Sequence, residues 1–232
     1  MNARVEQSDI YNAEWAANYE RRANAAIAGR DGLYRLCVAA LAAIPAPQDI
    51  LVVGCGTGEE LDALATALPA VRFDGIDPSA AMLEFCRTRL VRQSVHSRVS
   101  LHACTLSGFA TTRQYQGATS ILVAQHLPDG EAAAFFRQIS ALLEPGAVLF
   151  TADLHIPAGQ DRQDTLALWR RQAELAGNEP ELLDGMSARF ATDIRPRDED
   201  EIKGLLTGSG FHRVLKAFSS TIYGAWVASR QG

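Results

Sequence analysis

Short runs of apolar residues alternate with segments of helical periodicity along the middle of the chain. The apolar runs predict five strands, at residues 49–53, 71–76, 99–103, 119–124 and 147–152. Between the first two runs, Leu61, Leu64, Ala65 and Leu68 recur at the spacing of one helix face. A strand–helix alternation of this kind is typical of an α/β fold, in which helices cover both faces of a mostly parallel sheet.

The helices of this segment are predicted by the same spacing. Residues 33–44 form a helix that ends at Pro45. The helix that begins at Pro78 is expected to bury one face, formed by Met82, Phe85 and Leu90. The helix after the fourth strand has five apolar residues in register: Phe135, Phe136, Ile139, Leu142 and Leu143. Each of these helices therefore has one face suited to packing on a sheet.

The alternation stops after Asp153. Residues 164–176 predict an amphipathic helix that includes Trp169, and a polar stretch that contains Met186 and Phe190 follows. This apolar surface exceeds what a simple connection between two elements needs. We expect a helical cap insert over residues 154–197, with a surface that packs on the core, on a substrate or on a second subunit.

The last part of the chain predicts a helix and two strands. Asp198 and Glu201 have the spacing of a capping box, so a helix begins there. Two β-rich runs, residues 214–218 and 221–228, end the chain. The expected fold class is therefore α/β, a doubly wound, Rossmann-like, mostly parallel seven-stranded sheet with a C-terminal antiparallel β hairpin and a helical cap insert.

One domain accounts for residues 1–232, because 232 residues of which 47% are hydrophobic suffice for one sizeable core. Four parts are predicted within it: an N-terminal helical lid at 1–30, a cofactor-binding core at 49–153, the cap insert at 154–197, and the C-terminal helix and strands at 198–232. In the first part, Tyr11, Trp15 and Tyr19 follow one another at the spacing of one helix face. An aromatic stripe of this kind is typical of packing, and it is also suited to covering a bound ligand.

Composition narrows the class of partner. The formal net charge is only -5, and both signs are spread along the chain. No basic tract resembles a nucleic-acid footprint, so nucleic acid is excluded as the main partner and a small-molecule substrate is favoured. The four cysteines show no spacing typical of a zinc site, so no metal is expected.

The same cysteines also bear on the compartment. Four cysteines without a Cys-x-x-Cys pair are typical of buried thiols in a reducing compartment. The first residues contain no apolar stretch that resembles a secretory signal. The longest apolar-rich stretch, residues 36–44, is far shorter than the ~20 residues that span a bilayer. We therefore expect a cytoplasmic protein with no membrane partner.

The first candidate ligand-binding segment is the glycine loop Gly54-Cys55-Gly56-Thr57-Gly58, directly after the first predicted strand. Glycines at this point let the backbone approach a ligand without a collision of Cβ atoms. The helix that follows offers free N–H groups to a carboxylate or phosphate. Asp77 ends the second strand, where a carboxylate is placed to accept hydrogen bonds from both hydroxyls of a ribose. Folds of this class bind ligands at this edge of the sheet.

Three classes of protein could contain a glycine loop of this kind. A nicotinamide-dependent dehydrogenase requires G-x-G-x-x-G, but its third glycine position is occupied here by Glu59, and the spacing is G-x-G-x-G. An ordinary strand–helix turn, or a silent ligand-binding domain, would need the three glycines and Asp77 to be accidental. A cofactor-binding enzyme of another class is therefore favoured.

Residues 49–153 resemble the class I S-adenosylmethionine-dependent methyltransferase family. The residues 51–58, LVVGCGTG, match its first motif, 75–83, GIDPSAAML, match its second, and 144–146, EPG, resemble its late motif. The resemblance implies S-adenosyl-L-methionine as the cofactor, with its methionine moiety on the glycine loop and its ribose on Asp77. The residues expected to bind it are Gly54, Cys55, Gly56, Gly58, Asp77, Pro78, Met82, Thr105, Leu106 and Ala124.

One position departs from the family pattern. An acid often follows the third strand and accepts a hydrogen bond from the adenine amino group, but Thr105 stands there in this chain. A hydroxyl also accepts such a bond, and the backbone N–H of Leu106 is placed to reach a ring nitrogen. The cofactor prediction therefore stands with altered adenine contacts.

A looser resemblance covers the rest of the chain. The segments AQHL at 124–127 and YGAW at 223–226, with the insert around Trp169, are similar in order and spacing to the carboxy-S-adenosylmethionine synthase branch. This resemblance implies an alternative function, in which the enzyme modifies the cofactor itself. It also implies that the insert forms a subunit contact, so a homodimer is predicted.

The leading prediction is transfer of a methyl group to a small-molecule acceptor, a metabolite or natural product. The cofactor is already activated, so the enzyme mainly orients a nucleophile and excludes water. His126 follows the fourth predicted strand, and Asp153 and His155 follow the fifth, so we expect these three in catalysis or in the acceptor pocket. The alternative for His126 is an ordinary solvent-facing loop residue. The residues expected to contact the substrate are Tyr11, Trp15, Tyr19 and Trp169.

Overall fold

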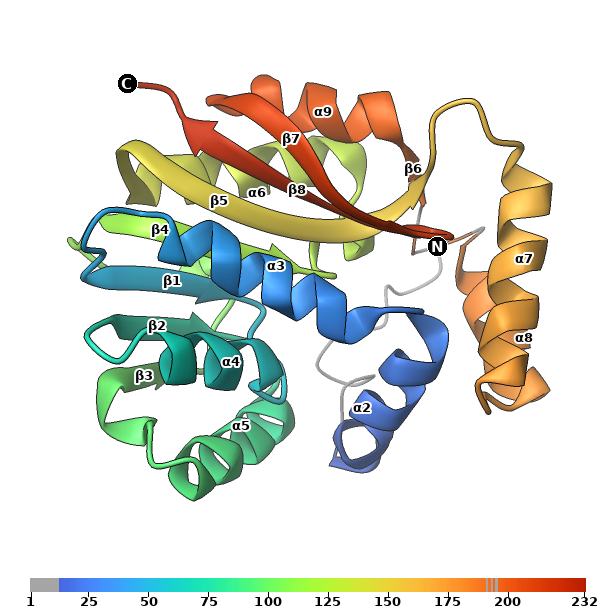
Figure 1. Ribbon diagram of the computed structural model, residues 1–232, viewed down its shortest axis with the longest axis horizontal. Coiled ribbons are helices and arrows are strands. Elements are labelled where there is room, and N and C mark those ends of the chain that lie inside the picture. Colours follow the sequence, from blue (N-terminus) through green and yellow to red (C-terminus); the bar gives the residue numbers. More distant parts are fainter. Residues whose placement is uncertain (1–12, 191, 193, 195) are drawn as a thin grey trace.

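A computed structural model describes residues 13–190, 192, 194 and 196–232 of the chain. Its centre is a twisted sheet with the strand order β3-β2-β1-β4-β5-β8-β7 (Figure 1). The strands are β1 Asp49–Val53, β2 Arg72–Ile76, β3 Val99–His102, β4 Tyr115–Ile121, β5 Leu143–Ile156, β7 Phe211–Ser220 and β8 Tyr223–Arg230. The first five pair in parallel, and β8 pairs antiparallel with both β5 and β7. The predicted doubly wound sheet with a C-terminal antiparallel hairpin is confirmed. The two-residue strand β6 Arg197–Asp198 pairs in parallel with the end of β5 and makes an eighth strand beside the seven predicted.

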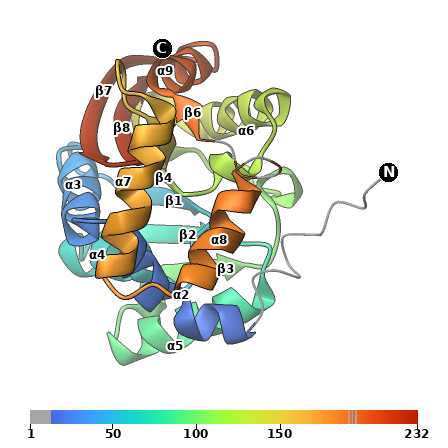
Figure 2. The same ribbon diagram turned by 90° about the vertical axis from the view of Figure 1, so that its right-hand side faces the viewer.

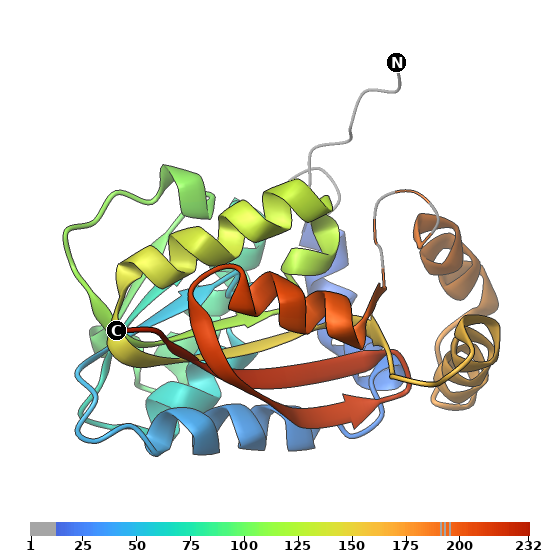
Figure 3. The same cartoon turned by 90° about the horizontal axis from the view of Figure 1, so that it is seen from above.

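Helices cover both faces of this sheet. On one face lie α3 Arg30–Ala42, α4 Glu59–Ala67 and α5 Ala80–Arg92, and on the other lie α6 Asp129–Leu142 and α9 Glu199–Thr207. Figure 3 shows α3 on one side of the strands and α6 with α9 on the other. Ile50 and Val52 of β1 pack under the first group, whereas Leu51 and Val53 pack under the second. This alternation follows from the two-residue period of a strand.

A third group of helices stands beyond the carboxyl ends of the parallel strands (Figures 1 and 2). It comprises α2 Ala13–Ala26, α7 Arg162–Leu175 and α8 Pro180–Arg189. The amide of Gln172 donates to the carbonyl of Ala25 at 3.0 Å, and that of Asn178 donates to the carbonyl of Arg22 at 3.2 Å. The N-terminal helix and the predicted cap insert are therefore packed against each other over the edge of the sheet where ligands bind in such folds.

Several predicted boundaries are wrong. The fourth strand was expected to reach Ala124, but β4 ends at Ile121 because Leu122 has a positive φ of 61° and the short 3₁₀ turn η3, Ala124–His126, follows. The fifth strand was expected to end at Ala152, but β5 continues to Ile156 because residues 153–154 pair with β8 and residues 155–156 pair with residues 197–198.

The insert and two helix faces also differ from the prediction. The polar stretch with Met186, for which no separate helix was predicted, contains the helix α8, which has Pro180 at its first position. Phe85 was expected on the inner face of α5 but is 40% exposed, because Leu83 and Cys86 take the buried positions. Leu143 belongs to β5 rather than to α6.

Other expectations are met or lie outside the described residues. The capping box of Asp198 and Glu201 is present at the start of α9. Tyr11 lies outside the described residues. In the described part of the chain, no helix combines the length and the apolar character needed to cross a bilayer. The division of the chain into lid, core, cap and C-terminal parts stays a prediction about their roles.

Candidate functional site

The glycine loop follows β1 and has a backbone that only glycine adopts easily. Gly54, Gly56 and Gly58 have φ values of 74°, 51° and 83°. A Cβ atom at Gly54 would overlap Cγ2 of Val123, and one at Gly58 would lie 2.5 Å from Sγ of Cys86. Gly54 therefore lets the segment after β4 approach the loop, and Gly58 lets the start of α4 pack on α5.

Asp77 ties this loop to the end of β2. Its carboxylate accepts hydrogen bonds from the backbone N–H groups of Gly56 and Ser79, both at 2.9 Å. Burial raises the pKa of the Asp77 carboxyl, and the two N–H donors oppose that rise. The pairing fixes Asp77 at the edge of a pocket and shapes the loop next to it.

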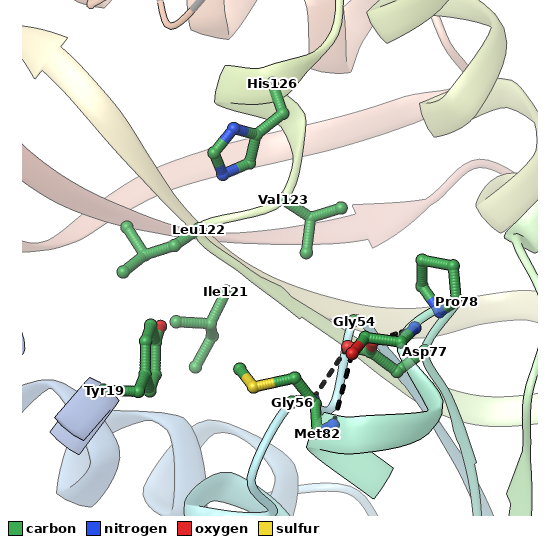
Figure 4. A pocket seen from close by; sticks show the side chains of 11 residues that line it. Tyr19, Gly54, Gly56, Asp77, Pro78, Met82, Ile121, Leu122, Val123 and His126 are labelled. Atoms are coloured by element: carbon green, nitrogen blue, oxygen red, sulfur yellow. Dashed lines mark hydrogen bonds between the residues drawn. The ribbon is translucent and has the colours of Figure 1, made fainter. Parts of the chain in front are cut away.

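A pocket runs along the glycine loop, and Figure 4 shows the side chains around it. Gly54, Gly56, Asp77, Pro78 and Met82 line one side. The opposite side is formed by other residues: Tyr19 from α2, the segment 121–123 and His126 of η3. We call this space the donor pocket. Five of the residues predicted to bind the cofactor are brought together here.

The space continues past Pro78 into a second hollow. Gly54, Pro78 and Val123 line both, and Thr105 and Leu106 lie in the continuation. These last two residues belong to the start of η2, Leu106–Gly108, where Thr105 is the N-cap and accepts a hydrogen bond from the N–H of Gly108 at 3.3 Å. The structure therefore places the predicted adenine-side residues next to the predicted ribose-side residues.

Three predicted cofactor residues do not line these pockets. Cys55 is buried in the core, and Gly58 packs against Cys86. Ala124 is buried under α6, and its carbonyl accepts a hydrogen bond from Arg197. The structure therefore does not bring these three residues to the pocket wall, and their binding of the cofactor stays a prediction.

A further pocket lies between α2, α8 and the carboxyl end of the sheet. It shares Tyr19, Leu122 and His126 with the donor pocket. The rest of its wall is mostly apolar and aromatic, and it includes Trp15, Tyr223, Met186, Phe190, Gln125 and Arg22. We call this space the acceptor pocket. Of the predicted substrate residues, Trp15 and Tyr19 line it.

Ionic contacts hold α2 against the glycine loop. Glu20 accepts a hydrogen bond from the hydroxyl of Thr57 at 3.1 Å and pairs with Arg89. Arg30, just after α2, is buried and pairs with Glu59 at 2.5 Å. These contacts keep Tyr19 between the two pockets.

Asp153 does not lie where it was predicted. It is inside β5, buried, and forms an ion pair with Arg197 at 3.4 Å. Burial raises the pKa of Asp153 to about 7, while Arg197 and the N–H groups of Leu154 and Gln125 oppose the rise. Arg197 also donates to the carbonyls of Ala124 at 3.1 Å and Leu127 at 2.6 Å. Asp153 and Arg197 thus bracket η3, the turn that carries His126, and act as positioning residues.

His155 and Trp169 are also misplaced by the prediction. His155 is fully buried within β5 and packs edge-on against Trp226, with ring centroids 5.2 Å apart. Trp169 is buried between α7 and the sheet and packs against Phe190 at 5.2 Å. Neither lines the donor or acceptor pocket. The extra length of β5 explains the first error, and the inward face of α7 explains the second.

The burial of His155 predicts an acid-sensitive fold. Burial, together with the nearby charge of Lys216, lowers the pKa of His155 to about 4, although Glu199 opposes this shift. In the unfolded chain the imidazole of His155 therefore binds a proton near pH 6.5, whereas in the folded chain it does so only near pH 4. Stability is full above pH 6.5 and falls by roughly 2 kcal/mol as the pH drops toward 4.

Urea unfolding between pH 7.5 and 4.5 checks this expectation. His155→Leu should lose less stability over that range than the native chain, because it has no imidazole to protonate. His212→Leu, on β7, is the matched control and should follow the native chain. Equal acid sensitivity of the native chain and His155→Leu would show that other groups cause it.

Sequence reasoning missed many lining residues of the acceptor pocket, among them Arg22, Leu122, Gln125 and Tyr223. A signal existed for Arg22, because it continues the spacing of Trp15 and Tyr19 by one more helical turn. Gln125 and Tyr223 carry no such signal, since loop geometry and sheet pairing bring them there. Among the described residues, no cluster of side chains suited to a metal ion is present.

Comparison with known proteins finds similarity to methyltransferases. Residues 50–146 match the family model described as a methyltransferase domain. An O-methyltransferase of Pyrenophora dematioidea is 29% identical over 174 residues, which is 74% of this chain and 57% of that relative. The chain thus spans little more than half the length of this relative.

Solved structures share the fold. The O-methyltransferase family 2 protein from Planctomyces limnophilus, solved as a complex with apigenin, has a TM-score of 0.68 at 15% identity, covering 97% of this chain and 62% of that one. Human N-acetylserotonin methyltransferase, solved with S-adenosylmethionine, has a TM-score of 0.61 at 12% identity, covering 86% of this chain and 52% of that one.

Proposed function

We propose that this chain carries a class I S-adenosylmethionine-dependent methyltransferase domain and that it transfers the methyl group to an oxygen atom of a small molecule. The observation that carries the proposal is the meeting of the donor and acceptor pockets at Tyr19, Leu122 and His126. Methyl transfer is an in-line displacement, so donor and acceptor must face each other across one short gap.

The donor side fits the cofactor. Gly56 and Asp77 present a bare backbone and a buried carboxylate at the pocket wall, and Met82 supplies an apolar contact. Thr105 and Leu106 offer hydrogen-bonding groups at the far end of the same space. In this arrangement Asp77 would hold the ribose hydroxyls, and residues 104–107 would hold the adenine. The bound cofactor supplies an electrophilic methyl group on its sulfonium.

The acceptor side supplies a base. His126 lies where the two pockets join, and its Nε2 lies 3.4 Å from the amide nitrogen of Gln125. A hydroxyl of the acceptor becomes a better nucleophile when its proton passes to a nearby imidazole. Tyr19 and Leu122 also line this junction. We propose His126 as the proton acceptor.

Calorimetry and product analysis test the proposal. The protein should bind S-adenosylmethionine and S-adenosylhomocysteine and should not respond to NAD, because the loop lacks the third glycine of a dinucleotide site. With a panel of phenols and hydroxy acids, mass spectrometry should find methylated acceptor and S-adenosylhomocysteine in equal amounts. Binding of NAD without binding of S-adenosylhomocysteine would overturn the proposal. A carboxylated cofactor as product would favour the synthase alternative, which stays a hypothesis.

Replacing Asp77 by alanine should weaken the binding of S-adenosylhomocysteine by roughly thirtyfold, because two charge-assisted hydrogen bonds to the ribose are lost. Asp74→Asn is the matched control: Asp74 is a buried acid on the same strand, but it bonds His102 and Arg113 away from the pocket. Isothermal titration of both variants, after circular dichroism shows that they are folded, makes the comparison. An unchanged dissociation constant for Asp77→Ala would remove Asp77 from the cofactor site.

A homodimer and a cytoplasmic location complete the proposal. The outer face of α7 exposes two leucines, Leu168 at 61% and Leu175 at 73%, which supports a subunit contact at the insert. Light scattering of the native chain and of a Leu168→Glu, Leu175→Glu double variant tests it. A monomeric native chain would remove the dimer from the proposal.

A further inference from the structure

We propose that Arg22 binds an anionic group of the acceptor, so that the substrate is a largely apolar, planar molecule that carries a carboxylate or a similar anion. This inference rests on the proposed function for the identity of the acceptor pocket. It adds the chemical class of the molecule that fills it.

Arg22 stands out among the neighbouring arginines by its lack of a carboxylate partner. Arg21 pairs with Glu179 at 3.8 Å and Arg30 pairs with Glu59 at 2.5 Å, but no carboxylate of the described residues pairs with Arg22. Its Nε is buried and has no hydrogen-bond acceptor among those residues. A buried donor without an acceptor is costly, so such a group in a pocket is suited to an acceptor that arrives with the ligand.

The orientation of Arg22 suits an incoming anion. Its guanidinium lies over the ring of Trp15, 4.9 Å from the centroid. This stacking fixes the plane of the guanidinium and leaves its edge free to donate two parallel hydrogen bonds to one carboxylate. Trp15 therefore holds the arginine in position without neutralising its charge.

The rest of the acceptor pocket selects the other features of the ligand. Its walls are mainly aromatic and aliphatic, from Trp15, Phe190, Met186 and Tyr223, and no Asp or Glu stands among the described residues that line it. Gln125 is only 9% exposed, and its Oε1 has no partner among those residues. Besides Arg22, a second arginine, Arg189, lines the pocket. The pocket therefore offers positive charge and one buried hydrogen-bond acceptor on a mainly apolar surface, which favours a flat acid with a polar hydrogen.

The two polar ends of the pocket have different roles. Arg22 lines the acceptor pocket but not the donor pocket, whereas His126 lines both. The anion is therefore held at the end remote from the methyl donor, and a hydroxyl of the same molecule lies near His126 and Gln125. In the reaction the acceptor oxygen forms a bond to the methyl carbon, the bond from that carbon to sulfur breaks, and the hydroxyl proton passes to His126.

Equilibrium binding tests the inference without requiring turnover. The probes are hydroxycinnamic and hydroxyphenylpropanoic acids, each paired with its primary carboxamide, titrated into protein saturated with S-adenosylhomocysteine. The acids should bind the native chain ~tenfold or more tightly than the amides, because only a carboxylate makes charge-assisted bonds to Arg22. Arg22→Gln should abolish this preference, and Arg22→Lys should keep part of it.

Arg21→Gln is the matched control, since it removes the same charge from the adjacent residue, whose side chain is 52% exposed. It should keep the preference for acids. The inference is overturned if the native chain binds acids and amides alike or binds no acid, or if Arg21→Gln and Arg22→Gln behave alike. Loss of the cofactor response alone would instead contradict the proposed methyl transfer, so the two failures are distinguishable.

Discussion

Replacing His126 by alanine should lower the rate of methyl transfer by about a hundredfold or more, because a positioned general base typically contributes at least that factor. The binding of S-adenosylhomocysteine should stay within about twofold, since the hydrogen bonds that we assign to the cofactor come from other residues. The rate at saturating acceptor and the dissociation constant of the cofactor product are the two measurements. His126→Gln should lose as much activity as the alanine variant, because glutamine keeps polar bulk but accepts no proton at neutral pH.

His96→Ala is the matched control for this prediction. His96 belongs to the 3₁₀ turn η1, His96–Arg98, and is exposed outside both pockets. It should keep the native rate. A His126→Ala variant that retains nearly full activity would show that the acceptor reaches the donor already ionised, and His126 would then be part of the pocket wall only.

The donor side was predictable because it is local in the sequence. The glycine loop, Asp77 and the strand–helix alternation lie within one continuous segment, and backbone chemistry dictates each of them. The predicted fold is confirmed, residues 50–146 match a methyltransferase-domain model, and Gly54, Gly56, Asp77, Pro78 and Met82 line one pocket. Their roles toward the cofactor stay predictions.

The acceptor side was less predictable because four distant segments build it. Trp15 and Arg22 come from α2, Gln125 from η3, Tyr223 from β8 and Phe190 from the end of α8. No periodicity links residues so far apart. The aromatic stripe of the first helix, His126 and the apolar residues of the insert were the only sequence signals for this pocket.

The error at Asp153 and His155 shows how tertiary pairing overrides local pattern. The apolar run from Ala147 was expected to end at Ala152, before the first polar residue. In the fold Asp153 and Leu154 pair with Gly224 and Tyr223, so the polar residues stay inside the sheet. A polar residue after an apolar run is therefore weak evidence for the end of a strand when a neighbouring strand is longer.

Replacing Arg197 by methionine should lower the free energy of unfolding by about 3–5 kcal/mol, because it leaves the buried Asp153 carboxylate without its cation. The carbonyls of Ala124 and Leu127 also lose a donor. Arg162→Met is the matched control: Arg162 likewise donates to a backbone carbonyl, that of Pro196 at 2.9 Å, but its side chain is 43% exposed. That variant should lose less than about 1 kcal/mol.

The pH dependence of this loss identifies its cause. The pKa of Asp153 is about 7 in the folded chain, above its ordinary value, so the folded carboxyl binds a proton more readily than the unfolded one. Stability linked to this group is thus full below about pH 4 and declines as the pH rises through 7. Without Arg197 the ionised Asp153 carboxylate costs more free energy in the folded chain. The destabilisation by Arg197→Met should therefore be larger at pH 8, where this carboxyl is ionised, than at pH 5.

A double-mutant cycle with Asp153→Asn completes the test. Asparagine keeps an oxygen that accepts from the N–H of Leu154, as Asp153 does at 3.0 Å, but it carries no charge. In that background Arg197→Met should cost about 1–3 kcal/mol less than in the native chain, and the difference should vanish at pH 5. Urea unfolding of the four proteins at both pH values measures it. Strictly additive losses at pH 8 would mean that Arg197 supports η3 through the two carbonyls alone, with no contribution from its ion pair with Asp153.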